Sequence, residues 1–206
     1  MSSTSNFWLI RHGETAWNNA MRLQGWRDIA LNETGIEQAR QLARYLTSAQ
    51  FTERIDVVVS SDLSRARDTA VIAAGHFGHP VVEMQALRER NYGIYEGHEL
   101  VMQPNGRANL RNFDLRCPHS PVEQGETLTA FAQRVHSAFE SLATQYAGQN
   151  IMVFAHGGVI DIVWRRAQQL GLDAFRRDPI RNCSINRFSI HADHQWQMHN
   201  WGHLVC

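Results

Sequence analysis

Apolar residues gather in short runs along the chain, and longer segments of mixed polarity separate these runs. Four of the runs are rich in β-branched or aromatic residues and end at polar positions: 6–10, 55–59, 81–82 and 151–154. Short runs of this kind are typical of strands that are buried on both faces of a parallel sheet. Two later runs, 184–190 and 195–201, predict two strands that pair at one edge of the sheet.

The segments between the runs place apolar residues three or four positions apart, which is the spacing of one face of a helix. Helices are therefore expected at about 34–48, 62–75, 127–146 and 158–169. We expect Ser60-Ser61-Asp62 to cap the second of these helices. Ser and Asp side chains accept hydrogen bonds from the first N–H groups of a helix.

This alternation predicts an α/β fold: a three-layer α/β/α sandwich with a mostly parallel central sheet and one antiparallel edge strand. Right-handed crossovers between parallel strands would place helices on both faces of the sheet. The length of 206 residues suits a single domain over 1–206. Within it, residues 98–124 contain several Pro residues and predict an irregular insertion with at most one short helix. We expect this insertion to act as a lid or to face the substrate.

Composition narrows the range of functions. The formal net charge is zero, which argues against a nucleic-acid partner, and all 20 cationic side chains are Arg. Cys117, Cys183 and Cys206 lie far apart and form no CxxC pair, which suggests a reducing compartment. The sequence shows no signal peptide and no membrane-length apolar run, so we expect a cytoplasmic protein with no membrane partner. The oligomeric state stays open.

Three of the predicted strands end in polar clusters that contain His, Arg or Ser. These clusters are Arg11-His12-Gly13, Ser60-Ser61-Asp62 with Arg65 a turn later, and His156-Gly157-Gly158. The carboxyl ends of parallel strands lie at one edge of a sheet, so the clusters should meet there. Arg side chains, helix N-termini and Gly-rich backbone all favour a phosphate group. The chain has no Walker loop and no cluster of carboxylates, so we expect phosphoryl transfer with no metal and no cofactor.

The order of these motifs resembles that of the histidine phosphatase superfamily, also called the phosphoglycerate mutase-like family. The similarity covers nearly the whole chain and would imply the fold of that family. The motifs that carry it are Arg11-His12-Gly13-Glu14-Thr15 with Asn18, Gln24-Gly25-Trp26, Ser60 to Ala70, Leu87-Arg88-Glu89 to Gly97, Gly125-Glu126-Thr127 and Ala155-His156-Gly157-Gly158.

The resemblance implies a role for each matching residue. His12 would attack phosphorus and form a phosphohistidine. Glu89 would protonate the leaving oxygen and then activate water. The phosphoryl oxygens would be bound by Arg11, Arg65 and His156. Further residues that would line the pocket for a small phosphorylated substrate are Asn18, Gln24, Gly25, Arg90, Tyr92 and Gly157.

The acceptor of the phosphoryl group is less clear from the sequence. The stretch from Arg90 to Gly93 resembles the mutase version of this block, whereas the stretch from Ile94 to Gly97 resembles the phosphatase version. The mutases have a Lys after the block and an Asn where this chain has Gly158. We therefore favour a phosphomonoester hydrolase over a phosphoglycerate mutase that depends on a bisphosphate primer. A non-catalytic phospho-ligand-binding scaffold is a minor alternative. Such proteins usually lose a catalytic residue, whereas this chain has all five candidates.

Two side-chain groups have no assigned role at this level. The insertion contains Arg107, Arg111 and Arg116, which either are solvated or recognise a second anionic group of the substrate. The C-terminal histidines are His191, His194, His199 and His203. We expect these to alternate along edge strands rather than to bind a metal.

Overall fold

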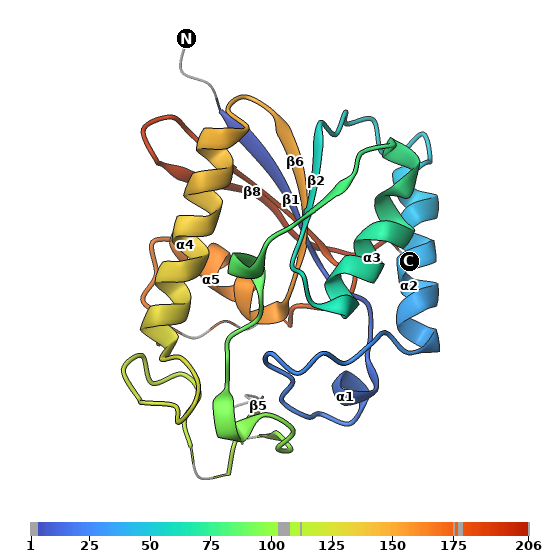
Figure 1. Cartoon of the computed structure of the whole chain (residues 1–206). Helices are drawn as coiled ribbons and strands as arrows, with labels where there is room; N and C mark the ends of the chain where they lie inside the picture. The colour runs from blue at the N-terminus through green and yellow to red at the C-terminus, as the bar shows by residue number, and fades with distance from the viewer. Residues whose placement is uncertain (1–3, 103–107, 112, 175, 177–178, 206) are drawn as a thin grey trace.

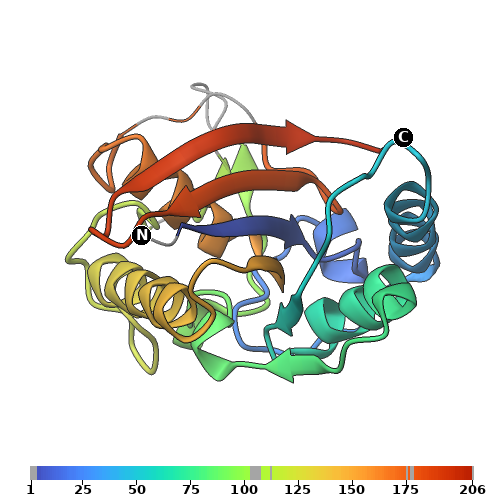
Figure 2. The same cartoon turned by 90° about the horizontal axis from the view of Figure 1, so that it is seen from above.

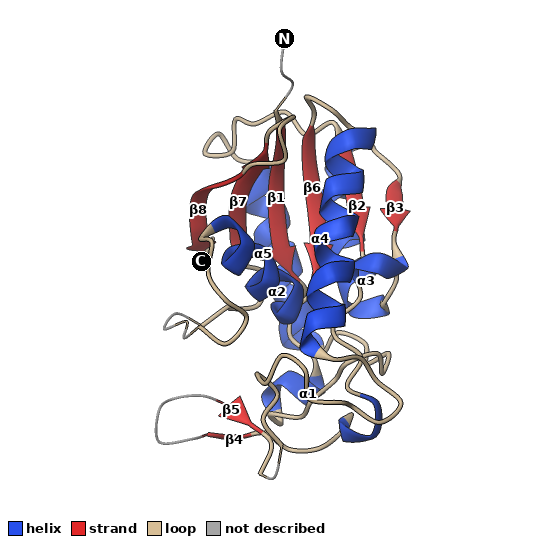
Figure 3. Ribbon diagram, turned by 90° about the vertical axis from the view of Figure 1, so that its left-hand side faces the viewer, coloured by secondary structure: helices blue, strands red, loops and turns tan. Residues whose placement is uncertain are grey.

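The computed structural model describes residues 4–102, 108–111, 113–174, 176 and 179–205. In this part of the chain the main sheet has six strands in the order β3-β2-β6-β1-β7-β8 (Figure 3). The strands are β1 (Ser5–Arg11), β2 (Val57–Ser60), β3 (Val81–Glu83), β6 (Asn150–Ala155), β7 (Ile185–Ile190) and β8 (Trp196–His203).

The first four strands of this order are parallel to one another. β7 runs antiparallel to β1, and β8, the outermost strand, runs antiparallel to β7. The expected α/β class, with a mostly parallel sheet and antiparallel pairing at one edge, is thereby confirmed. The two C-terminal strands pair with each other, as the apolar pattern predicts.

Two helices cover each face of the sheet (Figures 1 and 2). On one face lie α4 (Leu128–Gln145) and α5 (Gly157–Ala167), and on the other lie α2 (Glu33–Leu46) and α3 (Ser64–Ala74). The four helices therefore occur where the 3.6-residue period predicts them, with ends shifted by a few residues. Within the described ranges, no helix is both long and apolar enough to cross a membrane.

The apolar run of β1 is uninterrupted because both faces of the strand are buried. Successive side chains of a strand point to opposite faces. Phe7 and Leu9 accordingly pack in the core with α4 and α5, whereas Trp8 and Ile10 pack in the core with α2 and α3. All four are at most 2% exposed. β1 is thus a central strand that is buried on both faces.

The predicted cap of α3 is wrong. Leu63 occupies the N-cap and makes no side-chain capping bond, and α3 begins at Ser64. The hydroxyl of Ser61 instead lies 2.9 Å from Nε2 of His156, at the end of the sheet. The N–H of Ser64 donates to the carboxylate of Asp28, over 2.8 Å, from the loop after β1. A side chain distant in sequence therefore replaces the local cap.

The remaining elements are short and lie mostly in the connections. They are α1 (Ala16–Asn19), β4 (Val101–Met102), β5 (Ala108–Asn109) and the 3₁₀ turns η1 (Gly75–Phe77), η2 (Gln85–Leu87) and η3 (Gly93–Tyr95). α1 and the β4–β5 pair lie beyond the carboxyl ends of the parallel strands (Figure 3). In the described part of 98–124, the chain is irregular apart from this β-pair and forms no helix. The lid function of this segment stays a prediction.

The start of α2 packs directly against the backbone that follows β1. A Cβ added to Gly35 would lie 2.1 Å from the carbonyl oxygen of Glu14, and one added to Gly13 would lie 2.5 Å from the carbonyl oxygen of Gly35. Asn32 caps α2 by accepting a hydrogen bond from the N–H of Gly35, over 2.8 Å. Its amide group also donates to the Glu14 carboxylate, over 2.8 Å. The position of the loop after β1 therefore depends on the N-terminus of α2.

We predict that Gly35→Ala lowers the free energy of unfolding by about 2 kcal/mol, because an inserted methyl group in a tightly packed site costs roughly this much. Gly75→Ala is the matched control. Gly75 has a φ of −57° and no atom within 4 Å of an added Cβ, so this variant should be as stable as the parent or slightly more stable. Unfolding in urea, monitored by circular dichroism, measures the stability of both variants. Equal stability of the two variants would show that the glycine contact is unimportant.

Candidate active site

The polar residues that follow β1, β2 and β6 come together at one end of the sheet, where these strands end (Figure 1). Arg11 at the end of β1 lies beside Ala155 at the end of β6. The next residues along the chain, His12 and His156, are therefore neighbours, and their ring centroids are 5.2 Å apart. The prediction that the strand-end clusters meet is correct for these two histidines.

His12 is held in one orientation. Its Nδ1 donates a hydrogen bond to the carbonyl oxygen of Gly13, over 2.7 Å. Because a carbonyl only accepts, the neutral ring carries its proton on Nδ1 and leaves a lone pair on Nε2. Burial, together with the charges of Arg65 and Arg11, holds the pKa of His12 well below its usual value. The arrangement is that of a neutral imidazole whose Nε2 can act as a nucleophile.

His156 is fully buried beside it. Nε2 of His156 contacts the Ser61 hydroxyl at 2.9 Å, and Nδ1 is buried without a hydrogen-bond partner. Burial and the nearby charge of Arg65 hold the pKa of His156 well below its usual value. A buried ring nitrogen with no partner is unusual, and it leaves a free position for a ligand atom.

Main-chain carbonyls hold two cations in place, the buried Arg65 and the partly buried Arg11. Nη1 of Arg11 donates to the carbonyl of Ile180 over 2.5 Å. Arg65 donates to the carbonyls of Arg27 and Gly25 over 2.9 and 2.8 Å. Nε of each guanidinium is buried and makes no hydrogen bond. Burial lowers the pKa of Arg65 to about 10, so it remains charged at neutral pH. An anion between the two groups would satisfy both free N–H groups.

Glu89 is fixed against the N-terminus of α5. Its two carboxylate oxygens accept hydrogen bonds from the N–H groups of Gly158 and Arg90, both over 2.9 Å. A Cβ on Gly158 would lie 2.0 Å from Oε1 of Glu89. The position of the carboxylate therefore requires that residue 158 has no side chain. This finding gives Gly158, noted in the sequence only as a departure from the mutases, a physical role.

Three other predicted residues surround the guanidinium groups. An added Cβ on Gly157 would contact Nε of Arg11 at 3.6 Å, so the start of α5 lies beside that side chain. Gly25 contributes the carbonyl that holds Arg65. Gln24 is 8% exposed, and its Oε1 is buried without a hydrogen bond. Contact of these three residues with a substrate stays a prediction.

Asn18 is used for local structure. Its Oδ1 accepts hydrogen bonds from the N–H and the hydroxyl of Thr15, both over 3.2 Å, in a capping box at the start of α1. The amide of Asn182 lies 3.5 Å from the same Oδ1 and also donates to the carbonyl of His12, over 2.8 Å. Asn18 is thus close to the histidine, and these contacts show it bonded within the protein.

Arg90 and Tyr92 line a cavity of about 220 Å³ that Gly157 and Gly158 also line. The guanidinium of Arg90 lies over the Tyr92 ring, 5.4 Å from its centroid. Burial raises the pKa of Tyr92 above its ordinary value, so its hydroxyl stays protonated. We call this space the adjoining cavity.

The three Arg residues of the insertion have different locations. Arg116 also lines the adjoining cavity. Arg111 is exposed. Arg107 lies outside the described residues. Of the three, Arg116 is the one placed where it could meet part of a bound molecule.

Several residues that support the site have no individual role assigned from the sequence. Ser61 contacts His156, and the Thr69 hydroxyl accepts a hydrogen bond from the N–H of Gly13, over 3.0 Å. Arg134 donates to the carbonyl of Glu89 over 3.2 Å. Asn182 lies 170 residues after His12, in an irregular segment. Ser61 could have been found from its place directly after a strand, whereas Asn182 has no comparable signal.

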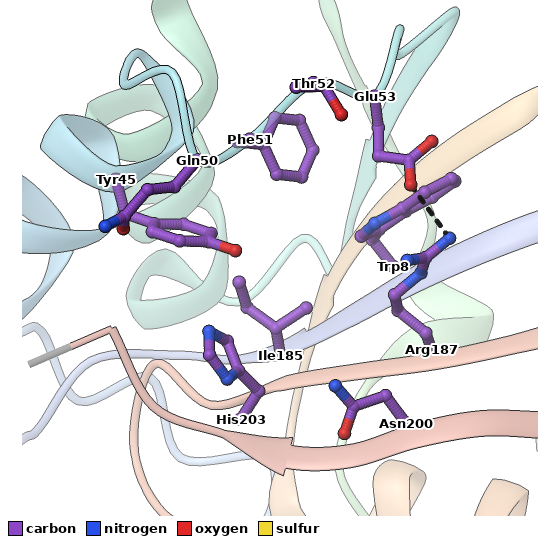
Figure 4. A pocket seen from close by; sticks show the side chains of 10 residues that line it. All are labelled: Trp8, Tyr45, Gln50, Phe51, Thr52, Glu53, Ile185, Arg187, Asn200 and His203. Carbon is purple, nitrogen blue, oxygen red and sulfur yellow. Dashed lines mark ion pairs between the residues drawn. The ribbon is translucent and has the colours of Figure 1, made fainter.

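A different crevice lies away from these residues, between the end of α2 with the segment before β2 and the strands β7 and β8 (Figure 4). It has a volume of about 140 Å³. Tyr45 and Phe51 form one side, and the ion pair between Glu53 and Arg187, at 3.1 Å, forms the other. None of the predicted site residues lines it.

Two of the four C-terminal histidines bond to other side chains. His191 contacts Thr4 and Gln197, and His199 contacts Ser189. Over the described ranges, no group of three or more His, Cys, Asp or Glu side chains is arranged to hold a metal ion.

Comparison with known proteins agrees with this geometry. The model of the histidine phosphatase superfamily (branch 1) matches residues 7–203. The chain belongs to this superfamily. It is 33% identical over 203 residues to phosphoglycerate mutase-like protein 4 of Arabidopsis thaliana, and the match covers 94% of this chain and 83% of the relative. Members of the superfamily are phosphatases or phosphoglycerate mutases, so the protein is an enzyme of one of these two kinds.

Two solved structures show the same fold. YhfR of Bacillus stearothermophilus superposes with a TM-score of 0.82 at 25% identity, over 97% of this chain and 98% of that one. The mycobacterial glucosyl-3-phosphoglycerate phosphatase Rv2419c superposes with a TM-score of 0.77 at 27% identity, over 97% and 98% of the two chains. The expected phosphoglycerate mutase-like fold is confirmed.

We predict that the two buried histidines make this protein less stable in mild acid. In the unfolded chain His12 and His156 take up protons near a pKa of about 6.5, whereas in the folded chain both pKa values are lowered. The unfolded state then binds more protons, so the free energy of unfolding falls as the pH drops below about 6.5. Each imidazole that stays neutral in the folded chain should lower the free energy of unfolding by about 1.4 kcal/mol for each further pH unit.

Urea unfolding in phosphate-free buffer at about pH 7.5 and about pH 5.5 measures this effect. The variant His12→Asn should lose less free energy between the two pH values than the parent does. His76→Asn, which changes an exposed histidine, is the control and should behave like the parent. An unchanged pH dependence in His12→Asn would contradict the prediction.

We also predict that Gly158→Ala lowers the hydrolysis of p-nitrophenyl phosphate about 10- to 100-fold, because displacement of a positioned acid or base costs up to this much or more. The added methyl group would push Glu89 from its place. If the two changes act through one group, Glu89→Gln combined with Gly158→Ala should be no slower than Glu89→Gln alone. Gly75→Ala, far from the site, should keep the parent rate. Additive losses in the double variant would disprove the link.

Proposed function

We propose that this enzyme is a phosphomonoester hydrolase that acts on a small phosphorylated metabolite through a phosphohistidine, without a metal ion. The observation that carries the proposal is the neutral His12, with Nε2 free, beside two buried guanidinium groups that each keep an unused N–H. A nucleophile next to unmatched positive charge suits a substrate that brings a dianionic phosphoryl group.

The first half of the reaction moves the phosphoryl group to the enzyme. Nε2 of His12 attacks phosphorus, and the bond from phosphorus to the leaving oxygen breaks. Glu89, in its protonated form, gives its proton to that oxygen, and the alcohol departs. Arg11 and Arg65 offset the negative charge on the equatorial oxygens.

His156 would serve the same oxygens. When the Ser61 hydroxyl donates to Nε2, the neutral ring of His156 carries its proton on Nδ1. Nδ1 has no partner in the folded chain. It can then donate to a phosphoryl oxygen without first breaking another hydrogen bond.

The second half returns the site to its starting state. The Glu89 carboxylate takes a proton from a water molecule as the water oxygen attacks phosphorus, and the bond between phosphorus and Nε2 breaks. Inorganic phosphate leaves, and Glu89 is protonated again. The hydrogen bonds from Gly158 and Arg90 keep the carboxylate in one place through both steps.

Hydrolysis is favoured over mutase activity by the chain's own residues. Glu89 occupies the space that a side chain at residue 158 would need, and the sequence offers no Lys after the acid block. The name of the mycobacterial neighbour also describes a phosphatase. Phosphoglycerate mutase activity is the second candidate, because Arg90 and Tyr92 match the mutase version of the block and the Arabidopsis relative is named for it. A cytoplasmic location stays a prediction from composition.

We predict that His12→Ala has no measurable phosphatase activity, because it removes the atom that bonds to phosphorus. The parent should hydrolyse p-nitrophenyl phosphate in the presence of a chelator, and rapid acid quench should give protein that carries one acid-labile phosphoryl group. His76→Ala is the control and should keep the parent rate. Parent-like turnover by His12→Ala would rule out this mechanism.

A second assay separates the two candidates. Release of inorganic phosphate without a bisphosphate primer indicates the hydrolase. Primer-dependent conversion of 3-phosphoglycerate to 2-phosphoglycerate, with little phosphate released, would instead establish the mutase.

A further inference from the structure

The proposed acid lies in a segment with no regular structure of its own. Glu89 follows the 3₁₀ turn η2 and precedes η3, and the residues between the two turns form neither helix nor strand. The N–H groups of Gly158 and Arg90 hold its carboxylate. They leave open what holds the backbone from which this side chain extends. Since a catalytic group works only within about 0.5 Å of its productive position, another part of the chain has to hold this segment.

Arg134 of α4 supplies much of this support. Its Nη1 donates to the carbonyls of Ala86 and Arg88, over 2.9 and 3.0 Å, and its Nη2 donates to the carbonyl of Glu89, over 3.2 Å. One guanidinium group thus binds three carbonyls that lie within four residues of one another. A planar group with several donors in fixed directions suits this arrangement better than a compact ammonium group does.

Glu126 holds the same guanidinium from the other side. Its two carboxylate oxygens accept from Nη2 and Nε of Arg134, over 2.5 and 3.3 Å. The main chain of Glu126 donates to the carbonyl of Asn91 over 3.0 Å, and its Oε1 accepts from the N–H of Asn91 over 2.8 Å. The Arg134–Glu126 pair therefore binds the backbone both before and after Glu89.

The carbonyl of Glu89 has a second donor, which connects it to the phosphate-binding end of the site. Nε1 of Trp26 donates to this carbonyl over 2.8 Å. The residues on either side of Trp26 are Gly25 and Arg27, whose carbonyls hold the guanidinium of Arg65. The position of the acid relative to Arg65 thus depends on the peptide group of Glu89 staying in place.

We propose that Arg134 is a positioning residue for Glu89. It would act through the backbone of the segment that carries the acid, so that the carboxyl group reaches the leaving oxygen and later the attacking water. The proposal rests on the proposed hydrolase function, because it takes Glu89 as the proton donor and base. It adds a residue on a distant helix to the groups on which the chemistry depends.

Two esters that differ in their leaving group test this role. p-Nitrophenol is a much stronger acid than phenol, so p-nitrophenyl phosphate needs little help from a proton donor, whereas phenyl phosphate needs this help. For Arg134→Gln we expect kcat/KM for phenyl phosphate to fall about 10- to 100-fold, since a displacement of about 1 Å can cost about 100-fold. The kcat/KM for p-nitrophenyl phosphate, which covers the steps up to release of the alcohol, should fall less than about 3-fold.

The same variant should accumulate the phosphohistidine. Glu89 is the proposed base in the second half of the reaction, and a displaced carboxylate would slow that half with every substrate. With p-nitrophenyl phosphate, Arg134→Gln should therefore release a burst of p-nitrophenol followed by slow turnover. Acid quench should find a larger phosphorylated fraction than in the parent. A merely unstable variant would contain less active protein, which lowers both kcat/KM values equally and gives no such accumulation.

The loss should require Glu89. Glu89→Gln combined with Arg134→Gln should be no slower toward phenyl phosphate than Glu89→Gln alone. Glu126→Gln weakens the ion pair and keeps a similar shape, so it should show the same selective loss to a smaller extent. This variant tests the proposal even if Arg134→Gln does not fold. Arg44→Gln removes an arginine from an exposed ion pair with Glu37 on α2, and as the matched control it should keep both parent values.

The outcomes separate this proposal from the one on which it rests. If the parent hydrolyses both esters through a phosphohistidine, but the variants of Arg134 and Glu126 lower the two kcat/KM values by the same factor or leave both unchanged, the positioning role is wrong and the hydrolase stands. Additive losses with Glu89→Gln also overturn it. If no phosphomonoester is hydrolysed and no phosphohistidine forms, the proposed function itself fails.

Discussion

Arg65 is buried and Arg11 is partly buried at the end of the sheet, and within the described residues both have main-chain carbonyls, rather than carboxylates, as hydrogen-bond partners. Removing two cations from water is costly, and the carbonyl dipoles compensate for part of that cost. Much of the surrounding structure follows from this requirement. Loops from distant parts of the chain must place their carbonyls at the guanidinium groups. Burial, together with the same two positive charges, lowers the pKa of the neighbouring histidines and so favours their neutral form.

The overall fold could be predicted from the sequence because its signals are local. The apolar run of β1 and the helical period of α4 reflect burial against the same sheet, and each is visible within a few residues. The meeting of His12 and His156 follows from the rule that parallel strands end at one edge. Local patterns, together with family motifs, thus led to the residues of the candidate site.

Contacts between segments distant in sequence could not be predicted in this way. The N–H of Ser64 uses the Asp28 carboxylate, so a local capping rule placed the start of α3 incorrectly. The fit of Glu89 against Gly158 depends on the approach of a loop to the N-terminus of α5, which no spacing encodes. Arg134 belongs to no motif, and its bond to the carbonyl of Glu89 joins residues 45 positions apart. These are details of packing, and packing sets the positions of catalytic groups.

The bond from Arg11 to the carbonyl of Ile180 joins the first strand to a late part of the chain, and this affects how the enzyme folds during synthesis. β1 lies between β6 and β7, so the first strand to be synthesised has no neighbour in the sheet until residues near 150 have been added. The carbonyl of His12 accepts a hydrogen bond from Asn182, which is synthesised later still. A nascent chain therefore contains the signature residues from the start but cannot hold them in their working positions until translation is almost complete. Loss of the C-terminal segment would leave the motif intact in sequence and without its geometry, and such long-range contacts are typical of slow folding.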